Sequence, residues 1–346
     1  AFQERPFFGW GPENFRQAFE RNFDNRLYQD EYLGEIWFDR AHNLLVDTLV
    51  SVGVVGFGVW VILAIVFVVV ITKARKRGLI GEWEAVLLST VPLAHFLQLQ
   101  TAFDTVGTYF FGVIILSYVL WLEKKTIDVQ TEQAPLWLSR FFVAPVLVLV
   151  TIAGFYFGIT EYGRQKALYK LFVTQNQKEQ LALAEKALSR PNFEALRLSS
   201  ASMIKGLLEQ MATEQIGPNF TQNALEQLSA YEKHFENYLS YYVDDYRVRM
   251  NYTHLLLIKT VLGENRLADA KKILQESYPL SQENPLTYAL AALAELYGGK
   301  IKEAKAKINE GIALNPEIEF SQQVLAHIEK QEKQFPVINV MKLENL

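Results

Sequence analysis

Long apolar stretches occupy residues 44–160, whereas residues 161–346 are rich in charged side chains and follow a helical period. Uncharged apolar stretches of about 20 residues are long enough for a helix to cross the ~30 Å hydrocarbon core of a membrane. The pattern therefore predicts four membrane-spanning helices, followed by a polar helical domain. The predicted spans are at about 49–72, 85–103, 106–122 and 141–159.

Basic residues between the predicted spans indicate their orientation. Residues 73–77, Lys-Ala-Arg-Lys-Arg, follow the first span, and residues 124–125 and Arg140 lie between the third and fourth. Loops rich in Lys and Arg face the cytoplasm. We therefore expect a multi-pass protein of the cytoplasmic (inner) membrane, with residues 1–43 and 161–346 both extracytoplasmic. The alternative is a re-entrant hairpin at the second span, which would move the C-terminal domain to the other side.

The C-terminal domain contains an internal repeat with a period of about 34 residues, the length typical of tetratricopeptide repeats. Residues 264–274 match residues 298–308 at their apolar and alanine positions, and residues 182–191 fit as a degenerate third copy. A proline after the second helix, here Pro316, is also typical of these repeats. The expected fold class is all-α, with polytopic transmembrane helices before an α-helical tetratricopeptide-like solenoid over residues 161–346.

Stacked helix pairs leave a concave surface that usually binds peptides or proteins. The repeats therefore predict either a protein partner or a cap on the membrane domain, and the sequence leaves both open. One helical stretch is rich in aromatic residues. Aromatic side chains can either stack on sugar rings or pack into a hydrophobic core. At this spacing we expect a repeat core for Tyr231, Phe235, Tyr238, Tyr241, Tyr242 and Tyr246.

Charge and cysteine content exclude several classes of protein. The 346-residue chain has a net charge of −4 and no cysteine. It therefore lacks the basic face expected of a nucleic-acid partner, and it has neither disulfides nor a thiolate metal site. We find no His-Glu-x-x-His motif and expect neither a metal nor a cofactor. Because the chain begins at Ala1 inside a predicted loop, we expect it to be the C-terminal part of a longer protein.

The loop at residues 1–43 carries the candidate chemistry. His42 lies just before the first span, where a neutral imidazole can accept a proton from a hydroxyl group. Arginine forks suit diphosphate groups, and the loop contains five of them: Arg5, Arg16, Arg21, Arg26 and Arg40. Without further context, however, such a histidine is more often an interfacial hydrogen-bonding group than a base, and loop arginines are often simply solvated.

Small and amide residues shape the same region. Gly9 and Gly11 predict a tight turn that brings backbone N–H groups near a ligand. Asn14 and Asn43 are local hydrogen-bonding residues that cap helices or hold the histidine. Glycines at the outer end of the first span indicate close helix packing, and these are Gly53, Gly56 and Gly58.

The run Pro-Phe-Phe-Gly-Trp-Gly-Pro-Glu-Asn-Phe at 6–15, the Ala-His-Asn at 41–43 and the basic turn at 73–77 resemble the O-antigen ligase and polymerase family. The similarity covers about residues 1–122. It implies a metal-independent membrane glycosyltransferase. The donor would be an oligosaccharide on a polyprenyl diphosphate, and the acceptor would be a glycan, a lipid or a protein at the outer face of the cytoplasmic membrane.

The resemblance also implies roles for individual residues. His42 matches the family's loop histidine, the candidate base that activates the acceptor, and Arg5 is a candidate for diphosphate binding. We add Asn14, Arg40 and Asn43 as substrate-binding candidates. The N-terminal helices of the family are not in this chain.

Two other functions stay open at this point. One is a membrane-anchored repeat scaffold that recruits envelope proteins without catalysis. The other is a transporter that uses polar residues of the second span, which are His95, Gln98 and Gln100.

Overall fold

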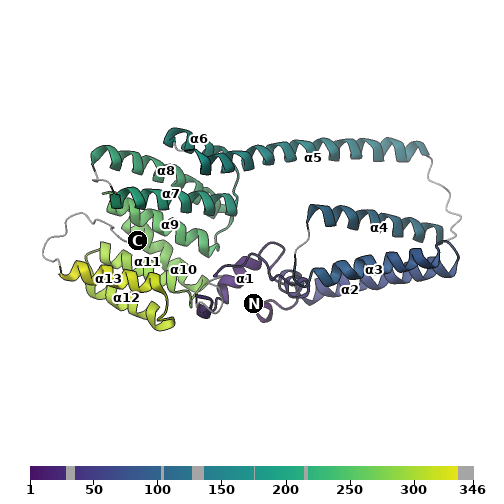
Figure 1. Ribbon diagram of the computed structural model, residues 1–346, viewed down its shortest axis with the longest axis horizontal. Helices are drawn as coiled ribbons and strands as arrows, with labels where there is room; N and C mark the ends of the chain where they lie inside the picture. The colour runs from purple at the N-terminus through teal and green to yellow at the C-terminus, as the bar shows by residue number, and fades with distance from the viewer. Residues whose placement is uncertain (29–35, 103–104, 127–135, 175, 214–216, 334–346) are drawn as a thin grey trace. The chain divides into compact units, whose positions relative to one another are not determined.

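The computed structural model describes residues 1–28, 36–102, 105–126, 136–174, 176–213 and 217–333. All regular secondary structure in these residues is helical (Figure 1). The predicted all-α class is therefore confirmed for the described part of the chain. The chain forms two compact units, one of residues 1–22 and 37–139 and the other of residues 23–36 and 140–346.

The first unit is built on one long apolar helix. Its helices are the short 3-10 helix η1 (Phe2–Glu4), α1 (Phe15–Arg21), α2 (Leu44–Lys76), α3 (Glu82–Gln98) and α4 (Val106–Thr126). Far from the loop, α2 packs against α3 and α4. The buried cluster there consists of Val70, Ile71 and Ala74 of α2, Ile80 just before α3, Ala85 of α3, and Val119 and Leu122 of α4.

Of the four predicted spans, only the first corresponds to a helix that is long and apolar enough to cross a membrane, among the residues described. That helix is α2, with 33 residues. The prediction of four such helices is thus not confirmed. At 1.5 Å per residue, the 17 residues of α3 extend only about 26 Å, and α3 contains Pro92 and His95. The fourth predicted span lies in α5 (Leu136–Val173). The side chains of residues 136–144 and 147 in this helix lie outside the described part of the chain.

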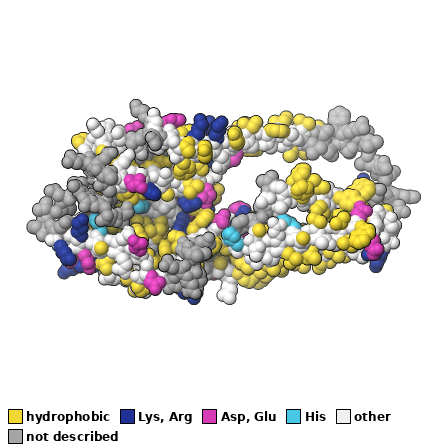
Figure 2. All heavy atoms as spheres, in the orientation of Figure 1, with side chains coloured by type: hydrophobic (Ala, Val, Ile, Leu, Met, Phe, Trp, Pro, Cys, Tyr) yellow, Lys and Arg dark blue, Asp and Glu magenta, His cyan; other side chains and the backbone are white. Residues whose placement is uncertain are grey.

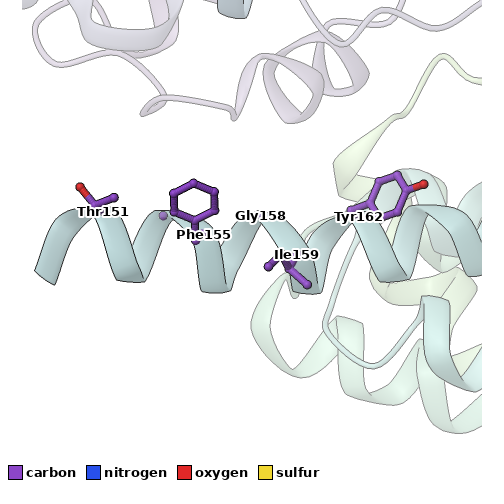
Figure 3. Close-up of a pocket in the computed structure, with 6 residues that line it drawn as sticks. Thr151, Phe155, Gly158, Ile159 and Tyr162 are labelled. Atoms are coloured by element: carbon purple, nitrogen blue, oxygen red, sulfur yellow. The ribbon is translucent and has the colours of Figure 1, made fainter. Parts of the chain in front are cut away.

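Apolar side chains are nevertheless exposed well beyond α2. Phe110 and Phe111 of α4 and Leu149 and Phe155 of α5 are each more than 60% exposed, and Figure 2 shows hydrophobic side chains along these helices. Figure 3 shows a shallow hollow on α5, at Gly158 between larger residues. Because α5 alone lines this hollow, it cannot enclose a ligand.

The second unit contains the rest of α5 and the C-terminal helices. These are α6 (Gln177–Ala187), α7 (Phe193–Thr213), α8 (Pro218–Tyr241), α9 (Tyr246–Val261), α10 (Leu267–Ser277), α11 (Pro285–Tyr297), α12 (Ile301–Leu314) and α13 (Glu319–Lys333), with the 3-10 helices η2 (Asn25–Tyr28) and η4 (Tyr278–Leu280).

The period of the sequence repeat is also the period of the helices. The spacing from the first residue of α10 to that of α12 equals the spacing from the first residue of α11 to that of α13. Ala270 and Ala304, the matched small residues, are fully buried. α11 packs on α12 so closely that a Cβ atom at Gly311 would lie 2.8 Å from the Cβ atom of Tyr288. The proposed third copy at 182–191 falls on the end of α6 and the turn after it.

The aromatic stretch forms core, as predicted, at four of its six positions. Tyr231, Phe235, Tyr238 and Tyr246 are buried, and the ring of Phe235 stacks on the ring of Tyr252 of α9. The prediction is wrong for Tyr241 and Tyr242, which are exposed. These two residues lie at the end of α8, where the chain turns towards α9 and no described helix covers them.

Part of the predicted loop belongs to the second unit and contacts the repeat helices. The hydroxyl of Tyr28 donates to the side-chain oxygen of Asn284, the N-cap of α11, at 3.3 Å. The side chain of Asn315, the C-cap of α12, donates to the carbonyl oxygen of Asn25 at 2.9 Å. Arg247 of α9 donates to the carbonyl oxygen of Ile36. The repeat helices therefore hold a segment that precedes α2.

Candidate functional site

Helix α2 is broken where the loop meets it. Gly53 has φ 65° and ψ −170°, a backbone region that only glycine adopts without strain. A break of this kind removes the normal hydrogen bonds between N–H groups and the carbonyl groups four residues earlier. The unpaired groups then need other partners, above all close to a membrane, where backbone polar groups must be satisfied by the protein.

The loop supplies these partners. The N–H groups of Trp10 and Gly11 donate to the carbonyl oxygens of Val50 and Ser51, both at 2.8 Å. In the other direction, two N–H groups that follow the break donate to the loop: Val54 to the carbonyl oxygen of Pro6 at 2.9 Å, and Val55 to that of Phe7 at 3.2 Å. Residues 6–11 are therefore attached to α2 through four backbone hydrogen bonds.

Two glycines make this close approach possible. A Cβ atom on Gly53 would lie 2.3 Å from the carbonyl oxygen of Phe7, and a Cβ atom on Gly9 would lie 2.5 Å from the backbone of Ser51. The prediction that Gly53 serves helix packing is therefore wrong, because its contact is with the loop. A Cβ atom on Gly58 would meet nothing within 4 Å.

The prediction that the turn at Gly9 and Gly11 offers N–H groups to a ligand is also wrong. Gly11 donates to Ser51, and Gly9 donates to the carbonyl oxygen of Arg5 at 3.0 Å. The turn therefore uses its donors to build the loop and to attach it to α2.

Trp10 is the centre around which two of the predicted site residues gather. The guanidinium of Arg5 lies 4.3 Å from the centroid of the Trp10 ring, which is a cation–π contact. The side chain of Asn14 donates to the carbonyl oxygen of Trp10 at 3.0 Å, and the indole N–H donates to the carbonyl oxygen of Ala1 at 3.1 Å. Asn14 thus shapes the turn, while Arg5 keeps an exposed cation on a buried ring.

Three of the other loop arginines are held by carboxylates. Arg21 pairs with Glu4 at 3.2 Å, and Arg26 pairs with Asp24 at 2.5 Å. The hydrogen bonds from Arg26 lower the pKa of Asp24. Arg21 and Arg26 therefore each have a carboxylate partner within the loop.

Arg40 is the third. Its guanidinium lies 2.6 Å from a carboxylate oxygen of Glu13 and 4.0 Å from one of Asp47. Burial lowers the pKa of Arg40, but the attraction of Glu13, Asp47 and Asp39 outweighs it, and the net pKa is raised. Arg40 therefore connects the turn around Glu13 to the first turn of α2, and its charge is balanced by protein carboxylates.

His42 and Asn43 lie at the start of α2. His42 is exposed, has φ 51° and faces the ring of Phe38 edge-on at 6.2 Å between ring centroids. The side chain of Asn43 accepts the N–H of Val46 at 3.1 Å, so the cap predicted for Asn43 is confirmed. A left-handed backbone conformation is unusual for residues other than glycine. Both His42 and Glu13 adopt it.

The structure thus gives the predicted residues different tasks. Arg5 and Asn14 meet at Trp10, Arg40 connects Glu13 to Asp47, and Asn43 caps α2. The predicted set leaves out three residues on which the arrangement depends, namely Trp10, Gly53 and Glu13. The sequence motif around Trp10 could have pointed to that residue. Nothing in the sequence, however, distinguishes Gly53 from its neighbouring glycines.

The described residues contain no group of three or more histidine and acidic side chains that could hold a metal. No family model, no curated protein and no solved structure matches the chain.

Proposed function

We propose that this chain is part of a membrane glycosyltransferase of the O-antigen ligase and polymerase type. The observation that supports the proposal most directly is the loop that pairs with the broken start of an apolar helix. That loop carries an exposed arginine on a tryptophan and ends in an exposed histidine. A rigid loop with a cation and a potential base at the end of an apolar helix suits a lipid-linked anionic substrate.

In the proposed reaction, an acceptor hydroxyl attacks the anomeric carbon of the lipid-linked oligosaccharide. The bond from this carbon to the diphosphate oxygen breaks, and the diphosphate keeps the electron pair. His42 accepts the hydroxyl proton as general base. Arg5, whose guanidinium lies on the Trp10 ring, would stabilise the charge on the leaving diphosphate. Arg40, Asn14 and Asn43 would position the loop.

The proposed location is the cytoplasmic membrane, with four crossings and with the loop and the repeat domain outside the cytoplasm. The cation-rich end of α2 (Lys73, Arg75 and Lys76) supports this orientation. The hydrogen bonds of Asn25, Tyr28 and Ile36 to the repeat helices support a shared compartment for loop and repeats. The proposed repeat type is tetratricopeptide-like, because both helices of the pair recur at the spacing typical of that repeat.

The test compares His42→Asn and Arg5→Ala with the unchanged protein in its own membrane. Asparagine tolerates the left-handed backbone of residue 42, so this variant removes the imidazole without new strain. Arg26→Ala is the matched control, since Arg26 lies in the same loop and is paired with Asp24. Loss of the base or the cation should slow consumption of the polyprenyl-diphosphate glycan by roughly 10²-fold or more at equal protein level.

A second function, a repeat scaffold that recruits envelope proteins, is favoured by the stacked helix pairs themselves. The same experiment separates the two. If both variants consume the donor at the unchanged rate, the glycosyltransferase proposal is wrong and the scaffold takes its place.

A further inference from the structure

A pocket of about 300 Å³ lies within the second unit, where α7 and α8 meet the end of α5 and the start of α6. From α7 it is lined by Ser199, Ser202, Gly206 and Gln210 among others, and these positions recur at intervals of three, four and seven residues. They therefore lie on one face of the helix. From α8 the pocket receives Gln227 and Tyr231, which are one turn apart.

The lining is polar but uncharged. Glutamines 180, 210 and 227 and the hydroxyl groups of Ser199, Ser202 and Thr174 lie among leucines, Met203 and Tyr231, and none of the described residues that line the pocket is acidic or basic. Without a counter-charge, the pocket does not suit a phosphate, a nucleotide or a carboxylate ligand. Amide and hydroxyl groups both donate and accept hydrogen bonds, which matches a ligand whose own groups also do both.

Part of this lining is already fixed by the protein. The side chain of Gln180 donates to the carbonyl oxygen of Thr174 at 2.9 Å, which leaves its oxygen to accept. The hydroxyl of Ser199 donates to the carbonyl oxygen of Ala195 at 2.6 Å. Tyr231 is buried, and this burial raises its pKa to about 12, so its hydroxyl stays protonated.

Gly206 is the most informative residue of the pocket. It lies inside α7, where glycine costs about 1 kcal/mol relative to alanine. A Cβ atom at Gly206 would meet nothing within 4 Å, and its φ lies outside the left-handed range. Neither packing nor backbone conformation therefore explains this glycine. Within the pocket, the missing side chain leaves the α7 backbone open to a ligand that approaches it.

We infer that this pocket binds a neutral saccharide unit. Sugar rings present hydroxyl groups that donate and accept and also carry apolar C–H faces, which matches the mixed lining of glutamines, serines and leucines. The volume lies at the lower end of the range for small-molecule sites, and a helical peptide about 10 Å across does not fit it. The site is separate from the chemistry proposed for His42 and Arg5, so either proposal can fail alone.

The probes are N-acetylglucosamine, galactose and mannose, each as the free sugar and as the methyl glycoside. Glucuronic acid and triglycine serve as charged and peptide comparisons. Binding is followed by saturation-transfer NMR on the full chain in lipid nanodiscs, because maltoside detergents would themselves offer sugar headgroups. A methyl glycoside resembles a sugar unit within a glycan chain. Comparison of the free sugar with its methyl glycoside therefore distinguishes a ligand that is a free saccharide from one that is part of a glycan.

At least one neutral sugar should bind, while glucuronic acid and triglycine should not. Gly206→Leu fills the pocket and should abolish the signal. Gly206→Ala should raise the melting temperature through helix propensity and yet weaken binding by about tenfold. Gln227→Leu should also weaken binding, and Gln222→Leu is its control, because Gln222 is an exposed residue of α8 outside the pocket.

Three outcomes would overturn the inference. The first is that no neutral sugar binds in either form. The second is that binding persists in both Gly206→Leu and Gln227→Leu. The third is that triglycine binds in place of the sugars, which would make the pocket a peptide site.

Discussion

The junction between the loop and α2 gives the sharpest prediction, through Gly53→Ala. In an uninterrupted helix, the carbonyl oxygens of Val50 and Ser51 accept from the N–H groups of Val54 and Val55. In the protein, these carbonyls accept instead from Trp10 and Gly11. An alanine at position 53 adds a Cβ atom 2.3 Å from the Phe7 carbonyl oxygen and strains the backbone at φ 65°. The helix should therefore close, and the loop should be displaced.

The magnitude follows from the four hydrogen bonds that hold the loop. Each has a net value of about 1 kcal/mol. Closure of the helix gives Val54 and Val55 new acceptors and so restores two of the four bonds, and opening the loop therefore costs about 2 kcal/mol before the substitution. This loss should raise amide exchange at Trp10 and Gly11 by roughly 30-fold, since 1.4 kcal/mol is a factor of ten. Val54 and Val55 should stay protected, because in the closed helix they donate to Val50 and Ser51.

Hydrogen–deuterium exchange with mass spectrometry in lipid nanodiscs measures this contrast. Peptides that cover residues 6–15 should exchange fast in Gly53→Ala, whereas those that cover residues 54–58 should not. Gly58→Ala is the control, because a Cβ atom there meets nothing and alanine favours the helix. If Trp10 and Gly11 remain protected in Gly53→Ala, the loop is not held by this junction and the reasoning fails.

Three further predictions concern stability. Asn43→Ala removes the cap of α2 and should cost about 1 kcal/mol in thermal unfolding. Glu232→Gln removes a buried carboxylate from Lys259 at 2.7 Å and Arg266 at 2.5 Å. Because Lys259 keeps Glu264 and Arg266 keeps Asp269, the cost should be about 2 kcal/mol in denaturant titration. Burial lowers the pKa of His254 from 6.5 to about 4. The unfolded chain therefore takes up a proton first, so stability should fall between pH 6.5 and pH 4, and His254→Gln should flatten that slope.

Periodic features of the fold could be predicted because they are local. The period of the repeats depends on which residues are small or apolar at the helix crossings, such as Ala270 and Ala304, and these are visible in the sequence. The same pattern assigned most of the aromatic stretch to the core. It failed at Tyr241 and Tyr242, because a helical period does not show where the helix ends and its neighbour no longer covers it.

The candidate site was harder to predict, since it depends on contacts between distant residues. The sequence shows that Arg5 and Arg40 are cations, but not that Arg40 lies between Glu13 and Asp47 while Arg5 lies on Trp10. Three glycines close together in an apolar helix look alike. Only the contact with the loop at 6–11, which lies far from Gly53 in the sequence, makes this glycine the position at which the helix breaks.

The contacts of the loop with the repeats also restrict the number of membrane crossings that the proposed location allows. Tyr28 and Ile36 precede α2, yet they hydrogen-bond to residues that follow α5. Groups that hydrogen-bond to each other share a compartment. If α2 crosses a membrane, as proposed, the chain must therefore cross back before it reaches the repeats. The proposed location therefore requires an even number of crossings between residue 36 and the repeats. One crossing by α2 alone cannot satisfy this condition, and neither can the three crossings left by a re-entrant second span, whereas two or four can. In the proposed arrangement, the exposed apolar side chains of α4 and α5 would supply the surface that such returns require.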